Sequence, residues 1–144
     1  MPAIEPFCHF IGINSYKLTK EEMLLLEADL LAHICEELKE VFRTQHKDYF
    51  RLMKLNKEKE DAMLEAKLAR LIIQDILSTK EYTLIGIASY TDSHEDVVQE
   101  ILDGRNINPS ATLLRKIIAL HRSVRNDLYH VIIKKVAVQY LTLP

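Results

Sequence analysis

The sequence has few of the residues that break helices. Its 144 residues include only three glycines and four prolines, and Pro109 is the only proline in the middle of the chain. Because glycine and proline punctuate turns and loops, their scarcity predicts a mostly helical, all-α protein.

Cysteines and long apolar runs are also scarce. Cys8 and Cys35 are too few for a disulfide framework, so we expect reduced thiols in a cytoplasmic protein. No apolar run reaches the roughly 18 residues that a membrane span needs. The N-terminus lacks the charged start and small-residue cleavage site of a signal peptide. These absences predict a soluble chain with no membrane partner.

Catalytic and metal-binding patterns are missing as well. The six histidines lie at no convincing ligand spacing to Cys, Asp or Glu, and the sequence has no glycine-rich phosphate loop or nucleophile elbow. We therefore expect a non-enzyme with no cofactor, no metal and no catalytic residue. The formal charge of −2 gives the chain as a whole no electrostatic attraction for nucleic acid.

The first part of the sequence predicts an arm and a long helix. Residues 1–16 are apolar and irregular, which fits either a short strand or an arm packed on the core. Thr19 and Glu22 have the spacing of a capping box that begins a helix. An apolar stripe then runs from Leu24 to Leu52, and its candidate dimerisation residues are Leu24, Leu31, Leu38 and Phe42.

Two arrangements can bury that stripe. In the first, a straight helix projects past a small domain and leaves its far end for a second copy, which predicts a homodimer. The side chains left uncovered are then Phe42, Tyr49, Phe50 and Leu52. In the second, the chain turns near His46 and folds back on residues 61–78, so that it covers its own stripe.

A charged segment separates this part from the rest. Residues 54–61 (KLNKEKED) indicate a solvated turn or an exposed piece of helix, and apolar periodicity predicts another helix over 61–78. We therefore expect an N-terminal extension over residues 1–60 and a second domain over residues 61–144.

Residues 83–120 have the pattern of two short helices that meet across a tight turn. The first helix needs a small residue at the crossing, which Ala88 supplies, and a capping residue, which Thr83 supplies. The second needs two inward apolar residues three apart, as Val98 and Ile101 are. Gly104 then provides a left-handed stop.

These spacings resemble the Cro and repressor (XRE-like) family of helix-turn-helix proteins. The resemblance is close over residues 83–120 and extends to about residues 61–138 with the flanking helices. It implies a five-helix, lambda-repressor-like domain whose last helix runs from about Arg125 to Tyr140. The implied function is a DNA-binding transcriptional regulator that acts as a homodimer on double-stranded DNA.

The sequence differs from that family at the turn and at positions that normally contact DNA. Leu84 stands where a phosphate-contacting Gln is common, and Asp92 replaces the usual turn glycine. The outward face of the second helix, which normally reads bases, carries Glu95, Asp96 and Glu100. Three carboxylates near phosphates repel DNA, which supports an alternative: a protein-interaction module on a degenerate helix-turn-helix, with the acidic helix binding a protein partner.

The charge changes sign after this helix. Residues 105–135 contain seven basic residues and one acidic residue, a net charge of +6, which fits either backbone docking on DNA or ordinary solvated faces. The resemblance makes the following residues candidates for DNA binding: Thr83, Ser93, His94, Glu95, Asp96, Gln99, Arg105, Asn106, Arg115 and Lys116.

Overall fold

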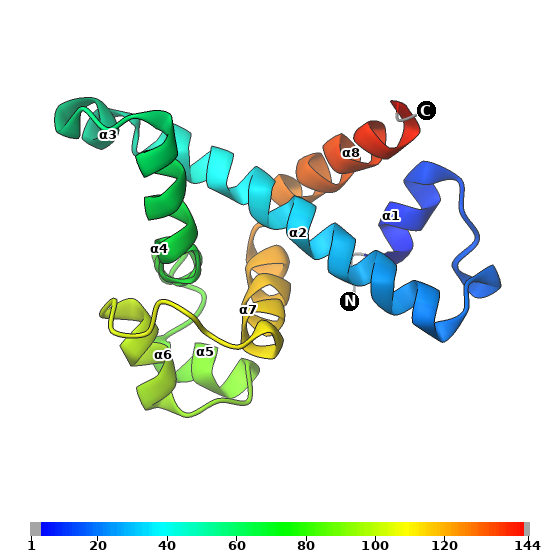
Figure 1. The fold of residues 1–144 in the computed structure, drawn as a ribbon. Coiled ribbons are helices and arrows are strands. Elements are labelled where there is room, and N and C mark those ends of the chain that lie inside the picture. The colour runs from blue at the N-terminus through cyan, green and yellow to red at the C-terminus, as the bar shows by residue number, and fades with distance from the viewer. Residues whose placement is uncertain (1–3, 143–144) are drawn as a thin grey trace. The chain divides into compact units, whose positions relative to one another are not determined.

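The structure, a computed structural model, describes residues 4–142. Over these residues the chain is helical and has no strand, which confirms the all-α prediction (Figure 1). None of the helices described is long and apolar enough to cross a membrane. The elements are α1 (Ile4–Ile11), the 3-10 helix η1 (Ser15–Lys17), α2 (Lys20–Gln45), α3 (Lys47–Met53), α4 (Lys57–Ser78), α5 (Leu84–Tyr90), α6 (Glu95–Leu102), α7 (Ala111–Val124) and α8 (Asn126–Thr142).

The chain divides into two compact units. The first contains the chain up to Glu37 together with the chain from Arg125 onward, and the second contains Leu38–Val124. This division differs from the one predicted at residue 60. The end of α2 and all of α3 belong with α4–α7, whereas α8, the expected fifth helix of the second domain, belongs with the N-terminal segment.

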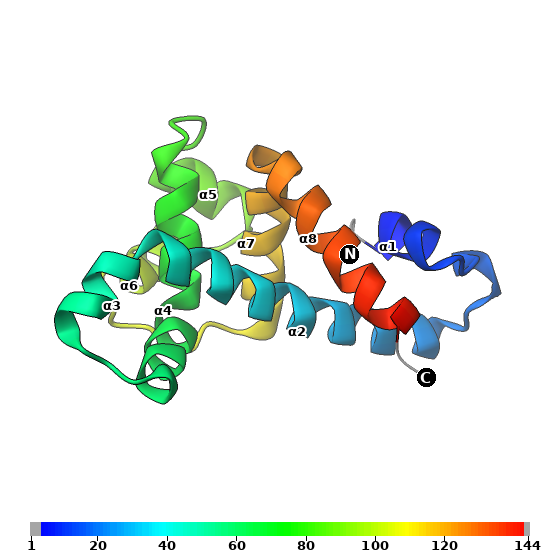
Figure 2. The same cartoon turned by 90° about the horizontal axis from the view of Figure 1, so that it is seen from above.

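In the first unit, α1 packs against α8 (Figure 2). Phe7 and Tyr129 are fully buried, and the rings of Phe7 and Tyr140 meet edge to face with centroids 5.0 Å apart. The strand considered for residues 1–16 is therefore wrong for residues 4–11, which are helical, while residues 1–3 lie outside the described residues. A short apolar stretch suits either element, and its contact with α8 stabilises the helix.

The capping box at the start of α2 is confirmed. The backbone N–H of Thr19 donates to Glu22 Oε1 at 2.9 Å, and the N–H of Glu22 donates to Thr19 Oγ1 at 3.1 Å. The bond from the Thr19 backbone, followed by that from its side chain, lowers the pKa of the Glu22 carboxyl. Two N–H groups at the helix start are thus satisfied locally.

The long helix predicted up to Leu52 is interrupted. α2 ends at Gln45, α3 follows after His46, and Lys54 adopts a left-handed conformation with φ 53°. Asn56 then caps α4 by accepting a hydrogen bond from Lys59 N at 2.8 Å. Residues 54–56 are therefore a turn, and the chain turns near His46, as the second of the two predicted arrangements required.

The turn covers much of the stripe that was expected to lie open. Phe42 and Phe50 are only 2% and 6% exposed, so the prediction that they lack cover is wrong. The physical reason is that the first half of α4 lies against α2 and α3: Arg43 pairs with Glu60 and Asp61, and Phe50 meets Leu64 at one pocket. The outward side chains Tyr49 and Leu52 stay exposed, as expected.

The four candidate dimerisation residues fall into two groups. Leu38 and Phe42 are buried within the chain itself, so in this conformation neither presents a surface to a second copy. Leu24 is 55% exposed and Leu31 is half-buried. Of these four candidates, the two in the first half of α2, Leu24 and Leu31, therefore have apolar surface accessible to a partner.

The core of the second unit lies between α4, α5, α6 and α7. α4 packs along α7, α5 packs against α6, and contacts of α6 with α4 and of α5 with α7 complete the unit (Figure 1). The predicted inward residues Ala88, Val98 and Ile101 are all buried. The other buried residues of these four helices are Leu64, Leu68, Ala69, Ile72, Ile73, Ile76, Ile87, Leu113, Ile117, Ile118, Leu120 and His121.

Candidate functional site: the surface around α5 and α6

α5 begins at a well-formed cap. The backbone N–H of Gly86 donates to Thr83 Oγ1 at 3.1 Å, which satisfies one of the open N–H groups of the first turn. The predicted capping role of Thr83 is confirmed. Its oxygen accepts this one hydrogen bond, and its hydroxyl proton remains a donor for a ligand.

The turn between α5 and α6 is fixed by one buried hydroxyl. Thr91 is 2% exposed, and its Oγ1 lies 2.9 Å from Ile87 O, 3.3 Å from Ala88 O and 2.7 Å from Ser93 Oγ. Asp92 adopts the left-handed conformation expected in place of glycine, with φ 52°. Ser93, a candidate DNA contact, is therefore half-buried and takes part in the turn.

α6 has an apolar inner side and an acidic outer side. Val98 and Ile101 are at most 1% exposed, whereas Glu95, Asp96 and Glu100 are exposed. None of these three carboxylates makes an ion pair or side-chain hydrogen bond with the residues that the structure describes. Their negative charges are therefore directed to solvent without compensation.

His94 caps α6 through its backbone only. Its φ of −71° and ψ of 144° place it just outside the helix, and its side chain makes no capping hydrogen bond. The exposed ring lies at the N-terminal end of the acidic face, directly before Glu95 and Asp96.

The candidate residues at the end of α6 bind one another. Asp103 accepts a hydrogen bond from Gln99 Nε2 at 2.8 Å and pairs with Arg105 Nη2 at 3.0 Å. The side chain of Asn106 accepts a hydrogen bond from Asn108 N at 3.1 Å. Gly104 has φ 79°, so the predicted left-handed stop is confirmed. Arg105 therefore has its charge partly neutralised by Asp103, which a phosphate would have to displace.

A small hollow lies between the turn and the start of α7. Its volume is about 210 Å³, and Asp92, Ser93, Ser110 and Lys116 are among its lining residues. Ser110 accepts a hydrogen bond from Leu113 N at 3.1 Å and so begins α7. The structure therefore brings Ser93 and Lys116 together, whereas Arg115 is half-buried and does not line this hollow.

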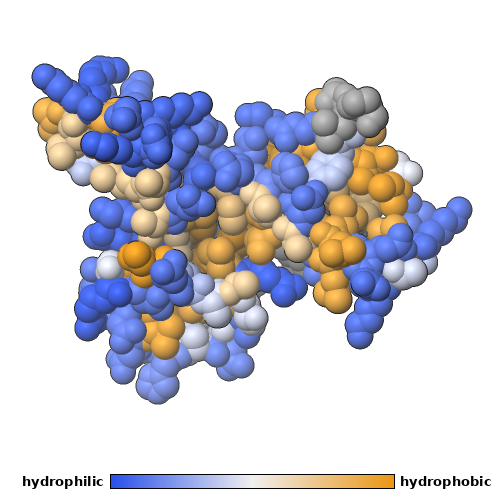
Figure 3. Space-filling view, in the orientation of Figure 1, coloured by the Kyte–Doolittle hydropathy of each residue, from blue (hydrophilic) through white to orange (hydrophobic). Residues whose placement is uncertain are grey.

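The charges of the second unit are strongly segregated along its sequence. Residues 81–104 contain no Lys or Arg, and their six carboxylates are those of Glu81, Asp92, Glu95, Asp96, Glu100 and Asp103. Residues 105–124 contain four basic residues and no acidic one. Hydrophilic side chains, interrupted by small apolar patches, cover the end of this unit where α5 and α6 lie (Figure 3).

One polar pair could not be found from the sequence. His121 is fully buried on α7, and its Nε2 lies 2.7 Å from Asp75 Oδ2 on α4. The two residues are 46 positions apart, so no local spacing pattern signals the pair. Within residues 4–142 no cluster of three or more His, Cys, Asp or Glu could hold a metal ion.

Comparison with family models, curated proteins and solved structures finds no match for this chain.

Proposed function

We propose that the α5–α6 pair is a protein-interaction surface on a helix-turn-helix scaffold, and that the acidic side of α6 binds a Lys- and Arg-rich segment of a partner protein. The observation that carries this proposal is the set of exposed, uncompensated carboxylates of Glu95, Asp96 and Glu100 within a 24-residue stretch without a single Lys or Arg. A cationic partner is attracted to such a surface, and a polyanion is repelled.

Helix stability accounts for only part of this acidity. Glu95 and Asp96 lie in the first turn of α6, where negative charge favours the helix dipole. Glu100 lies in the last turn, where a carboxylate opposes the dipole. Because Glu100 stabilises neither its helix nor an ion pair among the described residues, a partner is the better explanation of its charge.

A DNA-binding transcriptional regulator is the second candidate. Arg105 and Asn106 follow α6, where related folds contact the DNA backbone, and Ser93 and Lys116 share a hollow at the turn. Basic residues 105–124 would favour phosphates. However, base reading requires α6 to enter the major groove, and its outer side would bring three carboxylates close to the phosphates.

One binding experiment separates the two candidates. The full chain is titrated against a labelled, Lys- and Arg-rich peptide of about 12 residues and against a random duplex of about 20 base pairs. Fluorescence anisotropy is measured at about 50 and 200 mM salt. We expect the peptide to bind in a salt-sensitive manner and the duplex not to bind.

Two charge variants test which surface is used. Glu95→Gln combined with Glu100→Gln should weaken peptide binding by about three- to tenfold, because two exposed charge pairs are lost. The matched control combines Glu58→Gln with Glu65→Gln, which removes two exposed carboxylates from α4 and should leave affinity unchanged. Tight duplex binding without peptide binding would overturn the proposal in favour of the DNA-binding candidate. Equal effects of the two variant pairs would show only nonspecific attraction.

A further inference from the structure

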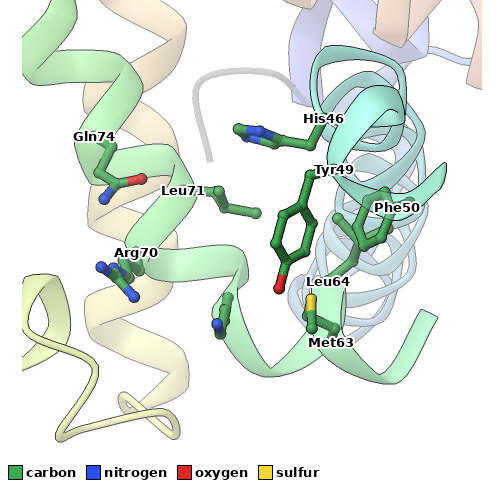
Figure 4. A pocket seen from close by; sticks show the side chains of 9 residues that line it. His46, Tyr49, Phe50, Met63, Leu64, Arg70, Leu71 and Gln74 are labelled. Atoms are coloured by element: carbon green, nitrogen blue, oxygen red, sulfur yellow. The ribbon is translucent and has the colours of Figure 1, made fainter. Parts of the chain in front are cut away.

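A pocket lies between α3 and α4 in the second unit (Figure 4). Its volume is about 210 Å³. An apolar cavity of about 150 Å³ is enough to hold benzene. The pocket therefore has room for one aromatic ring and a small substituent.

The inner wall of the pocket is apolar. Phe50 from α3 and Leu64 from α4 are 6% and 1% exposed, and Met63 and Leu71 extend this wall along α4. The ring of Tyr49 meets that of Phe50 at a centroid distance of 5.7 Å and an interplanar angle of 67°. Figure 4 shows Tyr49 and Leu71 facing each other across the opening. Such a wall favours a flat apolar group over water.

The rim of the pocket is cationic. Lys67 and Arg70 lie one turn apart on α4, and no Asp or Glu lines the pocket. Neither cation makes an ion pair or side-chain hydrogen bond with the described residues. Arg70 Nε is buried and has no hydrogen-bond partner among them. A buried donor of this kind normally has an acceptor, because leaving it unpaired is costly.

We propose that this pocket binds a small organic carboxylate whose apolar part is about one aromatic ring. The carboxylate accepts hydrogen bonds from the Arg70 guanidinium, with Lys67 as a second positive charge. The ring packs between Tyr49 and Leu71. An inorganic anion would leave the apolar wall uncovered, and a neutral ring would leave the charges of Lys67 and Arg70 without a counterion, so the two halves of the pocket together select an amphipathic anion.

Binding at Arg70 should also be detectable at a second place in the structure. The same side chain lines another hollow at the end of α6, together with Asp103, Gly104 and Asn106. A ligand that fixes the guanidinium should therefore shift the backbone amide resonances of Gly104 and Asn106 as well as that of Leu71. This inference is independent of what α6 binds.

The test uses benzoate as the probe and benzamide as its uncharged counterpart. Titration of the full chain, followed by amide chemical shifts, should give saturable benzoate binding with a Kd of about 1 mM or tighter. Benzamide should bind about tenfold more weakly. Absence of saturation by about 10 mM benzoate, or equal binding of the two compounds, would overturn the proposal.

Three variants locate the site. Arg70→Gln should weaken benzoate binding about tenfold or more, and Lys67→Gln should weaken it less. Lys67 is exposed, so its variant tests the site even if Arg70→Gln disturbs folding. The control is Arg51→Gln, because Arg51 on α3 is a highly exposed cation that does not line the pocket. Unchanged affinity in both Lys67→Gln and Arg70→Gln would place any benzoate binding elsewhere and refute the assignment.

Discussion

Removing the buried hydroxyl of Thr91 should loosen the turn between α5 and α6 at a cost that can be worked out from its contacts. In Thr91→Val, a methyl group replaces the hydroxyl near Ile87 O, Ala88 O and Ser93 Oγ. Both carbonyls keep a backbone donor, since Thr91 N and Ser93 N each approach them at 3.0 Å. The hydroxyl of half-buried Ser93 can form a hydrogen bond with water instead. The loss is therefore close to that of one net hydrogen bond, about 1 kcal/mol.

Urea unfolding followed by circular dichroism measures this cost. With a urea dependence of about 2 kcal/mol per molar, the midpoint should fall by about 0.5 M. The matched control is Thr44→Val, because Thr44 donates the same kind of bond to Glu40 O at 3.1 Å but is exposed. Its effect should stay within about 0.5 kcal/mol.

A double-mutant cycle shows whether the hydroxyl pair itself stabilises the turn. Ser93→Ala is made alone and together with Thr91→Val, and the two effects should couple by about 0.5 kcal/mol or more, because the two oxygens are 2.7 Å apart. If Thr91→Val is no worse than the Thr44 control and the two turn variants add independently, the reasoning is refuted.

Two further predictions concern pH and assembly. The hydrogen bond from Arg43 lowers the pKa of the Asp61 carboxyl below its ordinary value of 3.8, so this pair stabilises the fold above that pH and its contribution is lost as the pH falls below it. Asp61→Asn should therefore flatten the acid side of a profile of stability against pH between about pH 5 and 2, whereas the control Asp48→Asn should not. Acid sides with the same slope in the wild type and in Asp61→Asn would contradict this role of Asp61. For assembly, we expect light scattering to give about twice the chain mass of 16.7 kDa. Leu24→Glu should give a folded monomer, because Leu24 is exposed and its replacement does not disturb the core. A wild-type mass near 16.7 kDa at concentrations up to about 100 μM would refute the dimer.

Local signals in the sequence predicted local structure well. The capping box at Thr19 and Glu22, the cap at Thr83 and the left-handed residues Asp92 and Gly104 all occupy the expected conformations. Each depends on contacts within a few residues, so the type and order of side chains are enough to specify it. The inward positions of α5 and α6 follow for a similar reason, since one apolar side of a short helix must be buried.

The same local patterns could not predict which helices pack together over long distances in the sequence. The apolar stripe continues on both sides of His46 without a Gly or Pro, so periodicity alone allows a straight helix and a broken one equally. What favours the break is the contact of α3 with α4, which buries Phe50. The assignment of α8 to the unit of α1 also depends on partners far apart in the sequence.

The same limit applies to the two sites. The acidity of α6 could be predicted because consecutive turns of one short helix display it. The pairing of His121 with Asp75, and the meeting of Tyr49 with Arg70 at one pocket, require the chain to fold back on itself. In the sequence, Lys67 and Arg70 are an ordinary pair of helical cations, and they become a candidate binding site only where the fold places them beside the apolar wall of a pocket lined by no carboxylate.

The inner side of α6 determines how the helix packs, and its outer side determines what it can bind. Val98 and Ile101 must be apolar whatever the protein binds, because they pack α6 against its neighbours. These two residues therefore indicate the scaffold and give no information about the ligand. Glu95, Asp96 and Glu100 contribute little to that packing and are free to vary with the partner. In the function that we propose, a helix-turn-helix scaffold keeps its inner side while its outer side repels phosphates. Binding measurements on the matched pair of carboxylate variants therefore decide between a protein partner and DNA.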